Sequence, residues 1–295
     1  MLLTDVPRLP GMPDSLRRAL RVPAAPIELR EIDPRSTPLA PGDKERTREA
    51  TRLDATHLAE LQQRLYAEGT GGSRRRVLLV LQGMDTSGKG GVVEHVVGAM
   101  EPHGVAVASF GKPTPEELRH SFLWRVRRAL PGPGKVGVFD RSHYEDVLIG
   151  RVRELATPEV IERRYREIVR FERQLVADDV TVVKVLLHLS PWEQKQRLLA
   201  RLDDSSKRWK FDPADIDERA LWPQYQQAHA TALERTDTDT APWYVVPADR
   251  KWYRNWAVGR LLLETLTELQ PRLPEPAWDV DEQRDRLIEE HPIAG

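Results

Sequence analysis

The order of apolar and polar residues changes period along the chain. Between Lys44 and Glu68, leucines recur at helical spacing among charged residues, which predicts an amphipathic helix. These leucines are Leu53, Leu58, Leu61 and Leu65. Val77–Leu81, in contrast, is a continuous apolar run bounded by arginines and a glycine, which is typical of a strand buried on both faces of a parallel sheet.

Short apolar runs and longer amphipathic segments alternate through the rest of the chain. The strand candidates are Val77–Leu81, Val105–Ser109, Val136–Asp140, Val180–Leu189 and Trp243–Pro247. The helix candidates are Gly88–Met100, Pro115–Leu130, Pro158–Ala177, Pro191–Leu202, Leu221–Thr236 and Trp252–Leu269. This alternation predicts a doubly wound, mostly parallel α/β sheet with right-handed crossovers. In such sheets ligands bind beyond the carboxyl ends of the strands.

The first 45 residues carry eight of the 23 prolines and show neither helical nor strand periodicity. The eight are Pro7, Pro10, Pro13, Pro23, Pro26, Pro34, Pro38 and Pro41. Because proline fixes its own backbone and removes a donor, we expect an extended arm that wraps over the domain or a neighbouring subunit, or that is partly disordered.

Composition excludes several classes of protein. A chain of 295 residues with 40% hydrophobic residues can bury a sizeable core, so disorder throughout is excluded. The absence of cysteine excludes disulfides, thiolate metal sites and thiol nucleophiles. The sequence has no apolar run of membrane-spanning length, and prolines and acidic residues break up its first residues, so we expect a cytoplasmic protein without membrane contact.

A phosphate-binding loop follows the first predicted strand. Gly83-Met-Asp-Thr-Ser-Gly-Lys-Gly-Gly91 contains the G-x-x-x-x-G-K core of a P-loop, between a strand and a helix as that motif requires. Its glycines let backbone N–H groups surround a phosphate, and Lys89 supplies a cation. The candidate phosphate ligands beside Lys89 are Gly83, Thr86, Ser87, Gly88 and Gly90. An ordinary glycine-rich turn is the alternative.

Two positions in this loop change the expected chemistry. Gly90 stands where a serine or threonine normally ligates Mg²⁺, so the metal must be held by other residues. Asp85 would repel a bound anion unless a divalent cation lies between them. We therefore interpret Asp85 as a metal ligand or as a base for the acceptor, with a turn-forming role as the alternative.

The strand candidate Val136–Asp140 ends in a carboxylate, as a Walker B strand does. Asp140 is therefore a candidate Mg²⁺ ligand, and Arg141 is placed to bind phosphate oxygens. Glu145 is a candidate catalytic residue, but with Ser142 it has the spacing of a helix capping box, and both roles stay open. For His143 we favour a hydrogen-bonding role over that of a phosphohistidine nucleophile.

Positive charge gathers between Lys195 and Lys210, although the whole chain has a formal net charge of −1. The basic residues of this segment are Lys195, Arg197, Arg201, Lys207, Arg208 and Lys210. A basic segment after a helix in a P-loop kinase suggests a lid that closes over phosphates. A solvated charged face is the alternative, and the local charge imbalance around Trp209 and Phe211 favours the lid.

Several stretches together resemble the family-2 polyphosphate kinases, which are related in fold to thymidylate kinase. These stretches are LQGMDTSGKGG (81–91), FGKPTPEEL…LWRV (110–126), FDRSHYEDVL (139–148), RYREIVRFE (164–172), KRWKF (207–211) and APWYVVPADRKWYRNW (241–256). The resemblance covers roughly residues 27 to 270 and implies a P-loop kinase fold with a basic helical lid.

The resemblance also implies roles for individual residues. It implies that Asp85 and Lys89 act in the P-loop, Asp140 and Arg141 in the Walker B region, and the basic lid residues Arg197, Arg201, Lys207, Arg208 and Lys210 on polyphosphate. Mg²⁺ or Mn²⁺ is implied as well, with Asp85 and Asp140 as its ligands. HYEDVL (143–148) resembles the class that accepts both nucleoside mono- and diphosphates.

The expected function is transfer of the terminal phosphoryl group of inorganic polyphosphate to AMP, ADP, GMP or GDP, with the physiological direction left open. An ATP-dependent nucleotide or small-metabolite kinase of the same fold is the alternative. A module that binds nucleic acid is disfavoured by the neutral net charge and the absence of a recognised motif. Homo-oligomerisation, as a dimer or a tetramer, is a family expectation.

These inferences divide the chain into three parts. We expect a proline-rich arm at 1–45, a P-loop kinase domain at 46–275 with its lid at about 197–220, and a polar C-terminal tail at 276–295.

Overall fold

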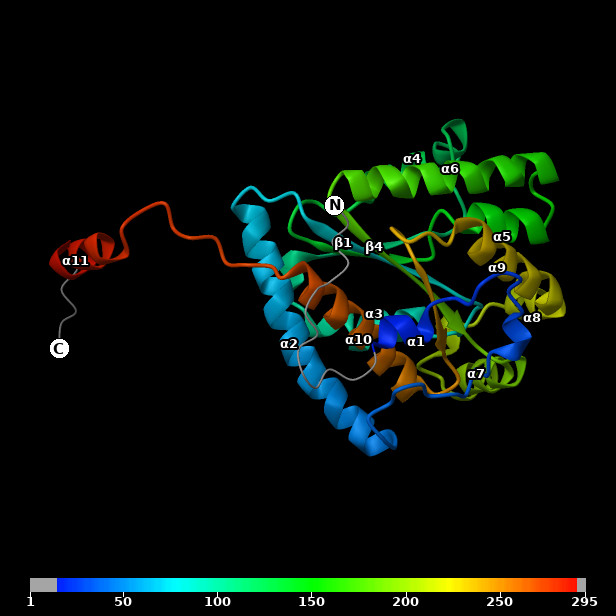
Figure 1. Ribbon diagram of the computed structural model, residues 1–295. Helices are drawn as coiled ribbons and strands as arrows, with labels where there is room; N and C mark the ends of the chain where they lie inside the picture. The colour runs from blue at the N-terminus through cyan, green and yellow to red at the C-terminus, as the bar shows by residue number, and fades with distance from the viewer. Residues whose placement is uncertain (1–14, 291–295) are drawn as a thin grey trace.

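Five apolar segments pair into one parallel sheet in the computed structural model, which describes residues 15–290 (Figure 1). The strands are β1 (Arg76–Gln82), β2 (Val105–Ser109), β3 (Val136–Asp140), β4 (Val180–His188) and β5 (Trp243–Pro247), in the order β2-β3-β1-β4-β5. This confirms the predicted α/β fold with a parallel sheet. The predicted bounds of β2, β3 and β5 agree with the structure to the residue.

Helices cover both faces of this sheet (Figure 1). The helices of the described residues are α1 (Leu16–Leu20), α2 (Lys44–Thr70), α3 (Lys89–His95), α4 (Trp124–Arg128), α5 (Glu145–Val152), α6 (Pro158–Ala177), α7 (Pro191–Asp203), α8 (Ala214–Ala220), α9 (Trp222–Thr236), α10 (Lys251–Leu269) and α11 (Val280–Glu290). Those that pack on the sheet include α2, α3 and α10 on one face and α5, α6 and α9 on the other. Short 3₁₀ turns lie at Leu29–Glu31, Val97–Ala99, Pro102–Gly104, Glu117–Arg119 and Arg208–Lys210. Within residues 15–290, no helix is long and apolar enough to span a membrane.

Successive residues of β1 face two separate cores. Val77, Leu79 and Leu81 pack with α2, α3 and α10 on one face, whereas Leu78 and Val80 pack with α5, α6 and α9 on the other. All five side chains are fully buried. A strand buried on both faces must be apolar at every position, which explains the continuous run in the sequence.

Two predicted helices differ from the structure. The helix predicted at 88–100 ends at His95 and continues as a 3₁₀ turn, because glycine at four of its positions weakens helix formation. The helix predicted at 115–130 is wrong as one element. Thr114 and Glu117 cap each other around a single 3₁₀ turn, and α4 begins only at Trp124.

The sequence pattern also missed α8. None of its residues is buried, so it has no apolar periodicity by which to recognise it.

The described part of the predicted arm packs on the domain, which is one of the expected alternatives. Its helix α1 buries Leu16 and Leu20 in one core, and Ile27 reaches the other core. Between them, the backbone N–H of Val22 donates to the carbonyl of Trp243 at 3.0 Å. The arm therefore covers the edge of the sheet at β5, where unpaired backbone groups would otherwise be exposed. The arm predicted for residues 1–14 lies outside the described residues.

The C-terminal tail contains a helix that the sequence analysis did not predict. In Figure 1, α11 stands away from the body of the molecule at the end of an extended segment. Its apolar side chains Leu287 and Ile288 are exposed. The predicted tail residues 291–295 lie outside the described part of the chain.

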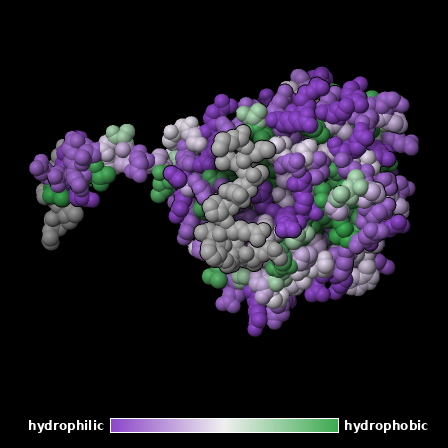
Figure 2. Space-filling model, viewed as in Figure 1, coloured by the Kyte–Doolittle hydropathy of each residue, from purple (hydrophilic) through white to green (hydrophobic). Residues whose placement is uncertain are grey.

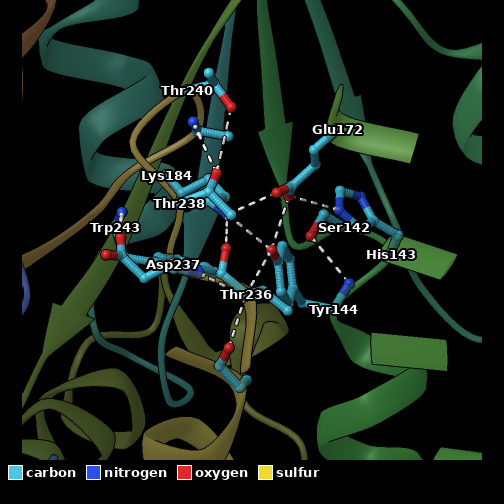
Figure 3. Close-up of polar contacts among 12 residues, drawn as sticks. Ser142, His143, Tyr144, Glu172, Lys184, Thr236, Asp237, Thr238, Thr240 and Trp243 are labelled. Carbon is cyan, nitrogen blue, oxygen red and sulfur yellow. Dashed lines mark hydrogen bonds and ion pairs between the residues drawn. The ribbon is translucent and has the colours of Figure 1, made fainter. Parts of the chain in front are cut away.

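A buried polar network joins the turn after β3 to three other elements (Figure 3). Lys184 of β4 donates through Nζ to Glu172 Oε2 of α6 at 2.7 Å and to the carbonyl of Thr236, where α9 ends, at 2.8 Å. The Tyr144 hydroxyl donates to Glu172 Oε1 at 2.7 Å, and His143 Nε2 lies 3.3 Å from the same oxygen. Burial favours a raised pKa for Glu172, but Lys184 and His143 lower it, so the carboxylate is ionised at neutral pH.

We expect Glu172→Gln to lower the free energy of unfolding by about 3–5 kcal/mol, because it leaves the Lys184 ammonium buried without a counter-charge. Chemical denaturation measures this change. Glu167→Gln on the same helix is the control, since Glu167 lies partly exposed beside Arg163 and such a surface pair contributes about 0–1 kcal/mol. Equal effects of the two substitutions would contradict a stabilising role for the buried pair.

Candidate active site

The P-loop occupies the turn between β1 and α3. Gly83 has a φ of +146°, and a Cβ there would lie 2.7 Å from the carbonyl oxygen of Leu187. Gly88 has a φ of +105°, and a Cβ there would lie 1.7 Å from Nη1 of Arg254. Side chains are therefore excluded at both positions, and the loop can keep its tight course only with glycine.

Lys89 begins α3 and is buried against the loop. Its Nζ donates to the carbonyl of Gly83 at 2.8 Å. Thr86 adopts a left-handed backbone conformation with a φ of +63°. The hydroxyl groups of Thr86 and Ser87 are buried and have no hydrogen-bond partner within residues 15–290. Buried polar atoms without partners are costly, and a phosphate in the loop would supply acceptors for them.

Gly90 lies in the first turn of α3 and is exposed. Open space surrounds the position where a Cβ would point. Sterics therefore do not explain why this position lacks the usual hydroxyl residue.

Strand register brings the second predicted motif to the P-loop. Asp140, the last residue of β3, lies opposite Leu81 of β1. Leu81 is two residues before Gly83, where the P-loop begins. Arg141 follows with a φ of +63° and donates through Nη2 to Asp85 Oδ1 at 2.6 Å. The structure thus gathers the predicted catalytic residues at the carboxyl ends of β1 and β3.

The charges in this cluster act on one another. Burial opposes ionisation of Asp85, but Lys89 and Arg141 outweigh it and lower the pKa of Asp85. Burial lowers the pKa of Lys89 against the attraction of Asp85, Asp140 and Glu145. Burial also raises the pKa of Glu145, although Arg141 and Lys89 oppose the rise. All three carboxylates therefore lie within the field of the same two cations.

Glu145 does not form the capping box that its spacing from Ser142 suggested. α5 begins at Glu145 itself, and its backbone N–H donates to the Ser142 carbonyl at 3.1 Å. The Gln82 amide, oriented to satisfy both of its ends, donates to Glu145 Oε1 at 3.0 Å and accepts from the Ser142 N–H at 3.1 Å. The Glu145 carboxylate thus bonds to Gln82 at the end of β1 and lies in the charge cluster, and the capping-box alternative is wrong.

His143 is fully buried beside Glu172 and Phe171. A phosphoryl donor cannot reach an imidazole with no exposed surface, so the hydrogen-bonding role fits this position. The network of Figure 3 contains this contact.

Comparison with known proteins places this arrangement in one family. The family described as Polyphosphate kinase 2 (PPK2) matches residues 42–274. The chain belongs to the polyphosphate kinase 2 family. This membership confirms the resemblance of the sequence motifs and makes the protein a polyphosphate phosphotransferase by family.

Individual relatives with polyphosphate phosphotransferase names align with this chain over most of their length. The chain is 46% identical to an AMP/ADP-polyphosphate phosphotransferase of Meiothermus ruber, over 86% of this chain and 94% of that protein. It is 41% identical to an ADP-polyphosphate phosphotransferase of Rhodopseudomonas palustris, over 79% of this chain and 83% of that one. The crystal structure of polyphosphate kinase 2 from Arthrobacter aurescens TC1 matches with a TM-score of 0.90 and 49% identity, covering 94% of this chain and 97% of that chain.

The predicted lid of this family member lies on α7, α8 and the 3₁₀ turn between them. Arg201 donates to the carbonyl of Lys210 at 3.0 Å and lies close enough to Asp85 to lower its pKa. Lys207 and Arg208 are exposed, as is Lys210, whose Nζ lies 5.0 Å from the centre of the Trp209 ring. Four of the predicted lid cations therefore lie on a surface segment that begins next to the P-loop.

Arg197, the fifth predicted polyphosphate ligand, is placed differently. It is only 8% exposed, and its Nη1 donates to the carbonyl of Thr86 at 2.8 Å. Its Nη2 donates to the carbonyl of Ala248 at 2.6 Å, and its Nε to Glu193 at 2.9 Å. Because the guanidinium is buried and occupied, Arg197 holds the P-loop in place beneath the site.

Sequence reasoning missed Arg254, which lies beneath the P-loop on α10. It is 3% exposed, donates through Nη1 to the carbonyl of Ser87 at 3.2 Å, and has no carboxylate within ion-pair distance in the described structure. Burial and the nearby Arg197 lower its pKa to about 10. The one sequence signal for Arg254 was its place in the motif at 241–256. Its contact with the loop could not be predicted, because only the fold brings α10 against Gly88 and Gly91.

The donor set fits a hard divalent cation. No cluster of three or more metal-ligating side chains exists within residues 15–290. However, Mg²⁺ typically binds one or two carboxylates and completes its shell with water and substrate phosphates. Asp85 and Asp140 supply that number of carboxylates beside a loop with unpartnered hydroxyl groups.

We expect Arg254→Met to lower phosphoryl transfer by about 10²–10³-fold, because it removes a preorganised cation beneath the P-loop. The thermal midpoint should not fall, since methionine removes a buried charge without a counter-ion. Steady-state rates and thermal unfolding measure the two effects. Arg250→Met, an exposed residue just before α10, is the control. A large loss of stability without loss of rate would contradict this role.

Proposed function

We propose that this protein transfers the terminal phosphoryl group of inorganic polyphosphate to nucleoside mono- and diphosphates, with AMP and ADP as the first acceptors and GMP and GDP as further ones. The observation that carries the proposal is the similarity to the AMP/ADP-polyphosphate phosphotransferase of Meiothermus ruber over 94% of that protein. The clustered P-loop, carboxylates and lid cations support it chemically.

The residues of the cluster divide the work by charge. The P-loop and Lys89 bind the phosphoryl group that is transferred, and Arg141 takes up negative charge as it develops in the transition state. The lid cations Arg201, Lys207, Arg208 and Lys210 bind the polyphosphate chain. Positioning and charge neutralisation are sufficient for phosphoryl transfer, so no covalent enzyme intermediate is required.

The carboxylates have two roles in this proposal. Asp85 and Asp140 would hold Mg²⁺ or Mn²⁺, which when bound neutralises charge on phosphoryl oxygens. Glu145 faces Lys89 and Arg141 and helps to position both cations. The Asp85–Arg141 ion pair keeps both groups ionised and aligned at the loop.

We propose the same division of the chain as the sequence analysis did: an arm at 1–45, a kinase domain at 46–275 with a lid at about 197–220, and a tail at 276–295. We also propose a cytoplasmic homo-oligomer, a dimer or a tetramer, without membrane or nucleic-acid partners. The covered edge of the sheet at β5 supports the arm as an integral part of the fold.

The function is tested by product analysis with purified protein, Mg²⁺, polyphosphate and one nucleotide at a time, without ATP. We expect AMP to give ADP and ADP to give ATP. The same reactions with ATP in place of polyphosphate are the comparison. Transfer from ATP alone, with none from polyphosphate, would favour the ATP-dependent kinase and contradict the proposal.

We expect Lys89→Ala and Asp140→Asn each to abolish polyphosphate-dependent transfer, because each removes a charge that the transition state requires. Initial rates over a range of Mg²⁺ concentrations measure this loss. Asp203→Asn, an exposed residue at the end of α7, is the control for removal of one carboxylate. Activity near the wild-type level in either site variant would disprove the assigned roles.

A further inference from the structure

A positively charged cavity, away from the candidate active site, lies where α6 meets the end of α9. Its volume is about 370 Å³. It is lined by Tyr165, Arg166, Val169, Arg170, Arg173 and Arg235, and we call it the arginine groove. None of these residues belongs to the P-loop, to the segment from Asp140 to Glu145, or to the predicted lid. Hydrophilic side chains cover the α6 side of the molecule in Figure 2.

Positive charge in the arginine groove exceeds the negative charge around it. Glu162 is the carboxylate at its margin, where it pairs with Arg235 and lies 3.7 Å from Arg166. Arg170 and Arg173 are exposed and form no ion pair within the described residues. Four guanidinium groups therefore face one shared carboxylate, an imbalance that favours an anionic ligand.

A buried polar group also lines the groove. Tyr165 is 2% exposed, and its hydroxyl has no hydrogen-bond partner within residues 15–290. A buried hydroxyl without an acceptor costs stability. Its oxygen has no exposed surface, so the four guanidinium groups, and not this hydroxyl, carry the argument for an anionic ligand.

The arginines also form a line. Arg166, Arg170 and Arg173 recur at spacings of four and three, so they share one face of α6. Seven residues of helix span about 10 Å at 1.5 Å per residue. A row of guanidinium groups with this length matches a linear polyanion better than a single compact phosphate, because successive groups can each bind successive phosphates.

We propose that the arginine groove is an accessory binding site for inorganic polyphosphate, separate from the catalytic cleft. The proposal rests on the proposed function, since it takes polyphosphate as the donor. A chain held in the groove keeps its remaining length near the protein, which raises the effective concentration of its end at the active site. A donor too short to reach both places gains nothing.

The test compares long-chain polyphosphate with tripolyphosphate as donors in the double variant Arg170→Gln/Arg173→Gln. Glutamine keeps much of the aliphatic stem and removes the charge. We expect the KM for long-chain polyphosphate to rise about tenfold, since two charge-assisted contacts are lost. The KM for tripolyphosphate and kcat with either donor should stay unchanged. The control is Arg48→Gln/Arg52→Gln, which removes the same charge from two exposed positions of α2 on the opposite side of the sheet.

A binding measurement separates this proposal from the proposed function. Fluorescent long-chain polyphosphate is titrated into Lys89→Ala protein, with and without the Arg170→Gln/Arg173→Gln pair. Weaker binding in the combined variant supports the groove even if the wild type shows no transfer. An equal KM change for both donors, or no change in either measurement, overturns the proposal. RNA that displaces the fluorescent polyphosphate at lower concentrations than unlabelled polyphosphate does would assign the groove to nucleic acid instead.

Discussion

The buried ion pair between Lys184 and Glu172 fixes the turn after β3, which carries the candidate catalytic residues Arg141 and Glu145. Lys184 comes from the strand next to β1, and Glu172 from the helix that covers it. Their shared partner Tyr144 precedes Glu145 directly. Because an uncompensated buried charge is costly, the pair holds β4, α6 and the turn after β3 in one arrangement. The left-handed backbone of Arg141 is held between this network and β1.

On the other side of the P-loop, two buried arginines fix the position of the loop itself. Arg197 and Arg254 donate to carbonyl groups of the loop and so fix the course of its backbone. Arg254 lacks a carboxylate within the described structure, and the proximity of Arg197 adds repulsion. An anion bound in the loop would therefore supply the counter-charge that Arg254 lacks. A net charge of −1 for the whole chain conceals this distribution.

Sequence patterns predicted those helices and strands in which burial imposes a regular spacing of apolar residues. The interior of β1 is a continuous apolar run because both of its faces are covered. The apolar runs of β2, β3 and β5 could be placed to the residue. The exposed α8 gave no such signal. At the site, motif residues such as Asp85 and Lys89 were predictable because they adjoin a strand. The burial of Arg197 and the approach of Arg254 to Gly88 were not, because both are tertiary contacts between distant segments.

The buried cations beneath the loop and the exposed cations on the lid affect the stability of the folded protein differently. Buried, preorganised charges beneath the loop lower the stability of the free protein, whereas exposed cations on the lid are hydrated and cost little. In the proposed function, a phosphate chain would supply a counter-charge for Arg254 and desolvate the lid cations. Its binding would stabilise the folded state through the buried cation, and the lid would add contacts that grow with the number of phosphates bound. We therefore propose that tight binding of one phosphoryl group and preference for a polymer arise from different residues of one cleft.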